Sequence, residues 1–120
     1  MFKKIYYVTR SGRKPVEEYI FEQDKKVIGK ILKSIQRLEE KGFLLIRPEA
    51  AKLRDKIYEL RIKFSPNNFR IFYYFCTGGY VILLHAVKKK TDEVKARDID
   101  TAESRMVEFE ERIRIGEIKL

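Results

Sequence analysis

The chain has 120 residues, enough for one domain with a single hydrophobic core, and we expect residues 1–120 to form that one domain. Hydrophobic residues make up 44% and charged residues 38%, which excludes a disordered chain, and the longest apolar run is too short to cross a bilayer. Lys3 and Lys4 exclude a signal peptide and the single Cys76 excludes an internal disulfide, so we expect a cytoplasmic protein.

The net charge of +9 is distributed unevenly along the sequence. Residues 1–15 carry five positive charges and no negative ones, and residues 52–70 and 85–97 are also basic. Residues 16–41 hold six acids and six bases, so we interpret this segment as neutral. Since no basic amphipathic helix is visible, the pattern favours nucleic acid over a membrane as the polyanionic partner.

The N-terminal third predicts a strand followed by helix. Phe2–Thr9 has the composition of a strand, and Pro15 suits the first turn of a helix because that position needs no N–H donor. Apolar residues then recur at helical spacing as far as Lys41 and Gly42, a usual helix end. Asp24 can cap a second helix, so either one kinked helix or two helices satisfy the pattern.

After a connector at residues 43–51, three strands are predicted over residues 58–64, 69–75 and 80–87. The first alternates between apolar and charged residues, the signature of a half-buried strand, and the third is so apolar that we expect it to be central. Turn residues separate them. Residues 91–97 then predict a loop, and residues 98–115 a helix that ends at Gly116.

This order predicts an α/β (α+β) fold with a small antiparallel-rich sheet, N-terminal helices packed on one sheet face, and a C-terminal helix. The other face, which we expect to be open, collects basic and aromatic side chains: Arg61, Lys63, Arg70, Phe72 and Tyr74, with Lys88, Lys89 and Lys90 at the strand end. Guanidinium groups match phosphate oxygens and aromatic rings stack on bases, so this face is typical of an RNA-binding surface. A merely solvated face is the alternative.

RNA can be cut without a metal, because the 2′-OH is its own nucleophile and fixed cations can stabilise charge on the phosphate. One histidine, one cysteine and no carboxylate pair at ligand spacing predict no metal or cofactor site. By strand alternation His85 shares a face with Val81, Leu83 and Val87, where it either packs at the core edge or transfers a proton. We interpret Cys76 as a packing residue.

A series of short motifs resembles the phage-derived branch of the HigB toxins in the RelE superfamily, in the same order and over nearly the whole chain. The motifs are Gly12-x-x-Pro15-Val16-x-Glu18-Tyr19, Lys52-Leu53, Ile57-Tyr58-Glu59-Leu60-Arg61, Phe69-Arg70-Ile71-Phe72-Tyr73, Ile82-Leu83-Leu84-His85, Lys88-Lys89-x-Thr91 and the helix with Ala102 and Arg105.

This resemblance implies a RelE-like fold and the toxin of a toxin–antitoxin pair, which cleaves mRNA on the ribosome without a metal. It implies a helix-turn-helix, HigA-like antitoxin as partner. Arg61, Arg70, Lys88 and Lys89 match the residues that contact the scissile phosphate, and Lys52 matches an upstream lysine. Many relatives carry a catalytic tyrosine or histidine where this chain has Asp92-Glu93-Val94-Lys95, so the base is missing here unless Lys89, Lys95 or His85 substitutes for it.

Two other functions fit the same fold. One is a ParE-type toxin, which inhibits DNA gyrase by binding a protein rather than by cutting RNA. The other is a catalytically silent relative that only binds nucleic acid.

Overall fold

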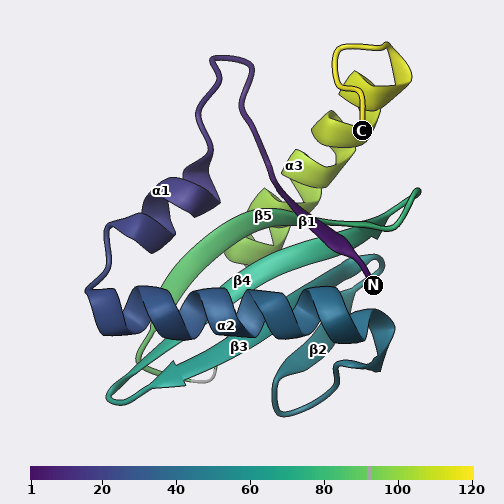
Figure 1. Cartoon of the computed structure of the whole chain (residues 1–120). Helices are drawn as coiled ribbons and strands as arrows, with labels where there is room; N and C mark the ends of the chain where they lie inside the picture. The colour runs from purple at the N-terminus through teal and green to yellow at the C-terminus, as the bar shows by residue number, and fades with distance from the viewer. Residues whose placement is uncertain (92) are drawn as a thin grey trace.

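The computed structural model describes residues 1–91 and 93–120; Asp92, in the predicted loop, lies outside the described residues. Figure 1 shows one sheet with helices on both of its faces. The strands are β1 (Lys3–Tyr6), β2 (Ala50–Arg54), β3 (Ile57–Phe64), β4 (Asn67–Cys76) and β5 (Tyr80–Lys89). The helices are α1 (Pro15–Phe21), α2 (Lys25–Lys41) and α3 (Ala96–Arg114), with a short 3-10 turn, η1, at Gly42–Leu44. Among the described residues, no helix is long and apolar enough to span a membrane.

The strands are ordered β1-β5-β4-β3-β2 across the sheet. β1 pairs with β5 in parallel, and the other neighbours are antiparallel. The sequence therefore predicted four of the five strands, β1, β3, β4 and β5, but β4, not β5, is the middle strand. It also missed β2, because Ala50–Arg54 is short and includes two alanines and a lysine, which are weak strand formers.

The N-terminal helical segment consists of two helices, one of the two alternatives that the sequence allowed. α2 ends at Gly42, whose φ of 52° lies in the left-handed region that favours glycine. A Cβ atom at this position would lie 2.2 Å from the ring of Phe2. Glycine is therefore favoured here both by the backbone turn and by the close approach of the Phe2 ring.

Each face of the sheet has its own hydrophobic core. α1 and α2 bury Val16, Ile20, Ile31 and Ile35 against one face, where they meet residues such as Leu60. α3 buries Ala102, Met106 and Phe109 against the other, as Figure 1 shows behind the sheet. The mixed α+β fold class, with the N-terminal helices on one face, is confirmed. The predicted open face is wrong, because α3 has an apolar stripe of its own and covers the second face.

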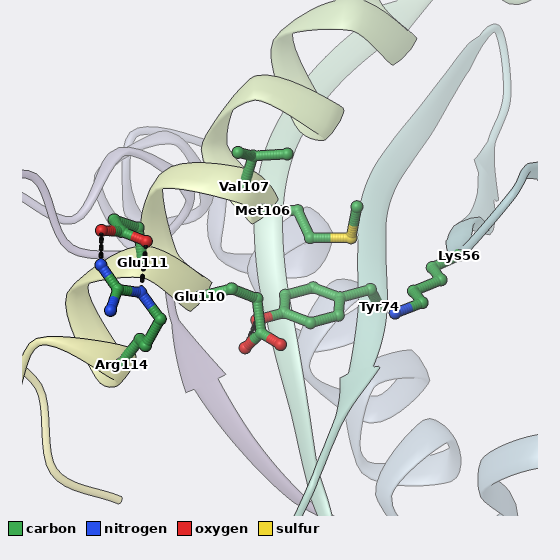
Figure 2. A pocket seen from close by; sticks show the side chains of 7 residues that line it. All are labelled: Lys56, Tyr74, Met106, Val107, Glu110, Glu111 and Arg114. Atoms are coloured by element: carbon green, nitrogen blue, oxygen red, sulfur yellow. Dashed lines mark hydrogen bonds and ion pairs between the residues drawn. The ribbon is translucent and has the colours of Figure 1, made fainter.

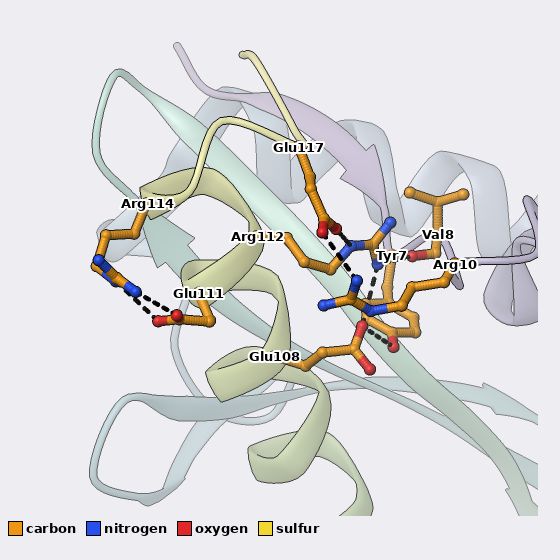
Figure 3. A network of polar contacts seen from close by, with 8 residues as sticks. All are labelled: Tyr7, Val8, Arg10, Glu108, Glu111, Arg112, Arg114 and Glu117. Carbon is orange, nitrogen blue, oxygen red and sulfur yellow. Dashed lines mark hydrogen bonds and ion pairs between the residues drawn. The ribbon is translucent and has the colours of Figure 1, made fainter.

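The C-terminal half of α3 is tied to the end of β1 by polar contacts (Figure 3). The Tyr7 hydroxyl donates to Glu108 at 2.8 Å. The buried Arg112 guanidinium donates to the Val8 carbonyl at 2.5 Å and to Glu108 at 3.0 Å, and its Nε lies 3.5 Å from Glu117. These contacts fix the far end of the helix and so set how its first turns lie on the sheet.

A β-bulge in β5 changes where His85 points. The β4–β5 register pairs Phe72 with His85 but Tyr73 with Leu83, so Leu84 is an extra residue. Val81 and Leu83 belong to the α2-side core, whereas Leu84 and Val87 belong to the α3 side. The prediction that His85 shares a face with Val81 and Leu83 is wrong, since the bulge shifts the alternation by one residue.

Candidate nucleic-acid interface

Basic residues from three strands lie side by side on the sheet face that α3 packs against. Arg61 on β3 is paired across the ladder with Arg70 on β4. In the next row on this face, Lys63 is paired with Asn68, and Asn68 in turn with Lys89 on β5. Directly opposed residues point to the same face of a sheet. The structure therefore places Arg61, Lys63, Arg70 and Lys89 on one face, at one end of the sheet.

Arg70 is the most deeply buried of these cations, with none of its side chain exposed. Its Nε lies 2.9 Å from a carboxylate oxygen of Glu59, which is also buried. A buried cation needs such a partner, because desolvation without one costs several kcal/mol, of order 3–5 when a partner is removed. Arg61 is only partly covered, and Lys63 is exposed. Arg70 thus forms the floor of the cluster, and Arg61 and Lys63 its edge.

Asp98, in the first turn of α3, joins the helix to this cluster. Its carboxylate accepts a hydrogen bond from Lys89 Nζ at 3.0 Å and contacts His85 Nε2 at 3.1 Å. Burial alone would raise the pKa of Asp98, but the hydrogen bonds from Lys89 and His85 outweigh it and hold that pKa below its usual range. Asp98 is therefore an ionised carboxylate that neutralises Lys89.

Both ring nitrogens of His85 are engaged. An ionised carboxylate only accepts, so Nε2 carries the proton shared with Asp98; a guanidinium only donates, so Nδ1 accepts from Arg105 at 3.5 Å. The ring also stacks on Phe72, with centroids 5.7 Å apart. Burial, followed by the charges of Arg105 and Lys89, lowers the pKa of His85. His85 is neutral at pH 7 and holds α3 in place.

The solvent-facing part of the interface is a hollow of about 190 Å³ where β5 ends, which we call the lysine hollow. Its lining residues are Lys88, Lys89, Lys90, Thr91, Glu93 and Lys95. Lys88, Lys90 and Lys95 are exposed, and Lys89 forms the buried wall. Ammonium groups gathered around one small hollow bind a phosphate group well. A phosphate can therefore bind in the lysine hollow without any change in the structure.

Phe72 and Tyr74, which we expected on an open surface, are buried in the core beneath α3. Figure 2 shows the Tyr74 ring between α3 and the strands, and its hydroxyl donates to Glu110 at 2.9 Å. Burial, with the neighbouring Cys76 and Glu110, raises the pKa of Tyr74. Neither ring can stack on a base while α3 is docked, so their predicted exposure is wrong. Cys76 is buried beside them, as expected of a packing residue.

Lys52 is not brought to this cluster. It is exposed on the edge strand β2 and is paired with Tyr58, whose side chain packs on the α2-side core. Sequence reasoning missed Glu59 and Asp98, the two acids that hold the buried cations. The only sequence signal for Asp98 was its position in the first turn of a helix, where acids are favoured. That position does not indicate a partner on a strand.

Within residues 1–91 and 93–120, no three His, Cys, Asp or Glu side chains gather closely enough to hold a metal ion. The family comparison matches residues 18–107 to the phage-derived Gp49-like protein family (DUF891). The match covers most of the chain and includes all the basic residues of the interface, so the chain belongs to this family, which is RelE-like and toxin-like. A comparison with curated proteins found no match.

Proposed function

We propose that this protein is the HigB-like toxin of a type II toxin–antitoxin system, a ribosome-dependent endonuclease that cuts mRNA without a metal. The observation that carries the proposal is the gathering of Arg61, Arg70, Lys89 and the lysine hollow at one end of the sheet. Membership of a toxin-like family supports it. The proposal includes a helix-turn-helix, HigA-like antitoxin and action in the cytoplasm, where mRNA is translated.

In this mechanism the 2′-oxygen of one nucleotide attacks its own 3′-phosphorus. The O2′–P bond forms and the P–O5′ bond breaks, which leaves a 2′,3′-cyclic phosphate and a free 5′-hydroxyl. Arg61, Lys88 and Lys90 stabilise the negative charge that builds on the phosphate oxygens. One group takes the 2′-OH proton and one supplies a proton to the 5′-oxygen; Lys89, Lys95 and His85 are the candidates.

Asp98 determines which of these groups can contact the phosphate. Its carboxylate holds the positions on Lys89 and His85 that a phosphate oxygen would take. Exposed lysines bind the strand first, and the phosphate then competes with Asp98 for Lys89. Lys95 lies at the start of α3, next to the helical turn that carries Asp98 and that must shift when Asp98 is displaced. Displacement of Asp98 releases Lys89 Nζ and His85 Nε2, so substrate binding completes the site.

The test maps mRNA ends by primer extension in a translating extract supplied with the purified protein. The double variant Lys88→Gln/Lys90→Gln removes two exposed charges, whereas Arg70→Ala would confuse loss of chemistry with loss of folding. We expect the lysine variant to lower the cleavage rate by about tenfold or more, since each charge stabilises the transition state by ~1 kcal/mol or more. Lys56→Gln/Lys119→Gln, which changes two exposed lysines elsewhere, is the matched control.

An mRNA with a single 2′-deoxynucleotide at the mapped cut site should resist cleavage, because it lacks the nucleophile. Cleavage of that mRNA at the same position would contradict the mechanism. Growth arrest with intact mRNA and DNA-damage signalling would instead indicate the gyrase-inhibiting alternative, and harmless expression would indicate the silent one.

A further inference from the structure

α2 carries a row of basic side chains on the side that faces away from the sheet core. They follow one another at spacings of four, three, four and four residues, which places them on one face of a helix: Lys26, Lys30, Lys33, Arg37 and Lys41. The buried residues of α2 lie on a different face, at Val27, Ile31, Ile35 and Leu38. We call the basic row the α2 stripe.

The stripe makes α2 a basic amphipathic helix, so the expectation that the chain has none is wrong, although the charges of residues 16–41 sum to zero. Four of the six acids in that segment precede α2, in α1 and the following turn. α2 itself holds six bases and only two acids, Glu39 and Glu40, near its C-terminal end. Lys26, Lys30 and Lys33 are all exposed. The N-terminal two thirds of α2 is therefore a cationic surface that the sum over the segment concealed.

The stripe continues onto the edge of the sheet. The β2–β3 register reaches Leu60 and the Arg61 N–H still donates to the Glu49 carbonyl at 2.8 Å, so the edge of β3 begins after Arg61. A hollow of about 270 Å³ lies at this edge, lined by Lys30, Ser34, Pro48, Glu49, Leu60, Arg61, Ile62 and Lys63. Lys30 Nζ lies 5.9 Å from the centre of the Phe64 ring, a distance at which the ring attracts the cation. α2 and β3 thus present their lysines to one shared hollow.

We propose that the α2 stripe and the adjoining β3 edge form a second nucleic-acid surface, which binds the sugar-phosphate backbone of double-helical RNA. Lys26 and Arg37 are eleven residues apart, which spans about 16 Å of helix axis. Such a straight row of charges fits a rigid backbone that presents phosphates at regular intervals. Arg37 contributes less than the lysines, because Glu49 accepts two hydrogen bonds from it, at 2.5 and 2.7 Å.

The choice of duplex over single strand follows from residue type. Proteins that hold single strands stack the bases on aromatic rings, whereas double-stranded RNA is held through phosphate and 2′-OH contacts. α2 has no aromatic residue in its sequence, and the members of the stripe are lysine and arginine alone. The stripe therefore offers backbone contacts and no platform for bases.

The two basic surfaces lie at the same end of the molecule. In Figure 1 the beginning of α2, the β3–β4 turn and the end of β5 all lie at the left. Arg61 and Lys63 lie between the two surfaces. They line the hollow beside α2 and also share a sheet face with Arg70. A folded RNA could thus be held by its duplex on α2 while a single strand enters the lysine hollow. Duplex binding itself does not depend on the proposed cleavage.

The experiment measures the binding of a labelled 20-base-pair RNA duplex by fluorescence anisotropy over a range of KCl concentrations. Lys26→Gln/Lys30→Gln/Lys33→Gln removes three charges of the stripe while keeping good helix formers. Lys3→Gln/Lys56→Gln/Lys119→Gln removes three exposed charges from other parts of the surface and is the matched control. Circular dichroism melting confirms that both variants fold.

We expect the stripe variant to bind the duplex about tenfold or more weakly and to lower the slope of log Kd against log salt by about 2.7, because each of the three phosphate contacts contributes roughly 0.9. The control should lose less than about threefold, and cleavage of single-stranded mRNA should persist. Equal losses in both variants would overturn the proposal, as would unchanged duplex binding. If the stripe variant keeps its duplex binding but no longer binds phosphatidylserine vesicles, the proposal is overturned in favour of a membrane surface.

Discussion

In the proposed mechanism, Asp98 is the residue that competes most directly with a phosphate for Lys89. It accepts from Lys89 and His85, two of the groups that a phosphate would need. Replacement by asparagine keeps the shape and one acceptor oxygen but removes the charge. We expect Asp98→Asn to bind an uncleavable single-stranded RNA about fivefold more tightly, since one charge interaction near a protein surface is worth ~1 kcal/mol. Anisotropy with a 2′-deoxy-substituted strand measures this.

Asp100→Asn is the control, because Asp100 is an exposed acid of the same helix turn that pairs with Arg54 at 2.6 Å. It loses the same charge but does not contact Lys89. Equal gains in affinity from both variants would mean that Asp98 acts only through net charge and does not compete for the phosphate position.

His85 makes the docking of α3 sensitive to pH. Its pKa is lower in the folded protein than in the unfolded chain, mainly because burial disfavours the charged ring. Between the ordinary pKa near 6.5 and the lowered one, the unfolded chain binds more protons, so stability falls as pH falls through this window. The melting temperature of the wild type should therefore drop between about pH 7.5 and 5.5, a range in which carboxylates hardly titrate.

The assignment is direct because His85 is the only histidine of the chain. In His85→Gln, which keeps a hydrogen-bonding side chain, the melting temperature should change much less over the same range. Parallel pH curves for the two proteins would show that His85 does not cause the loss.

At the scale of elements, α3 determines what the sheet can present. Phe72 is buried in the core beneath α3, and the second half of α3 is held to the segment after β1 by the buried Arg112. Arg112→Ala leaves the Val8 carbonyl and Glu108 without this donor, so we expect the free energy of unfolding to fall by about 2–4 kcal/mol. Urea denaturation followed by circular dichroism measures the change.

Arg114→Ala is the matched control for that experiment. Arg114 is only two residues further along α3, but it is exposed and pairs with Glu111 on the same helix. Surface pairs of this kind contribute little, so the loss should stay below about 0.5 kcal/mol. Similar losses in the two variants would contradict the anchoring role of Arg112.

Regular patterns made most of the elements predictable. Alternation indicated β3 and β4, and three-four spacing indicated α2 and α3. Two features broke these rules: β2 is too short and too polar to show a period, and the bulge at Leu84 reverses the alternation within β5. The side of the sheet on which α3 packs also followed from no local pattern, because an apolar stripe does not specify its partner.

Over the whole molecule, the linear sequence reveals only part of how the charged side chains are arranged. The cations of the interface were predictable from strand alternation and from the resemblance to HigB toxins. Their burial was not, because it depends on Glu59 and Asp98 reaching them from other elements. The α2 stripe was hidden because the neighbouring acids cancelled its charge in the sum over residues 16–41.

In the proposed function, the basic residues of the sheet face and of the lysine hollow hold one nucleotide linkage. A titration of ¹⁵N-labelled protein with a short single-stranded RNA, made uncleavable by a 2′-deoxy substitution, tests it directly by NMR. We predict that the largest amide shifts fall at residues 61–63, 88–91 and 95–98. Shifts that instead cluster around Lys56 and Glu111, which line a hollow beside the other end of α3, with none at the lysine hollow, would contradict this placement of the RNA.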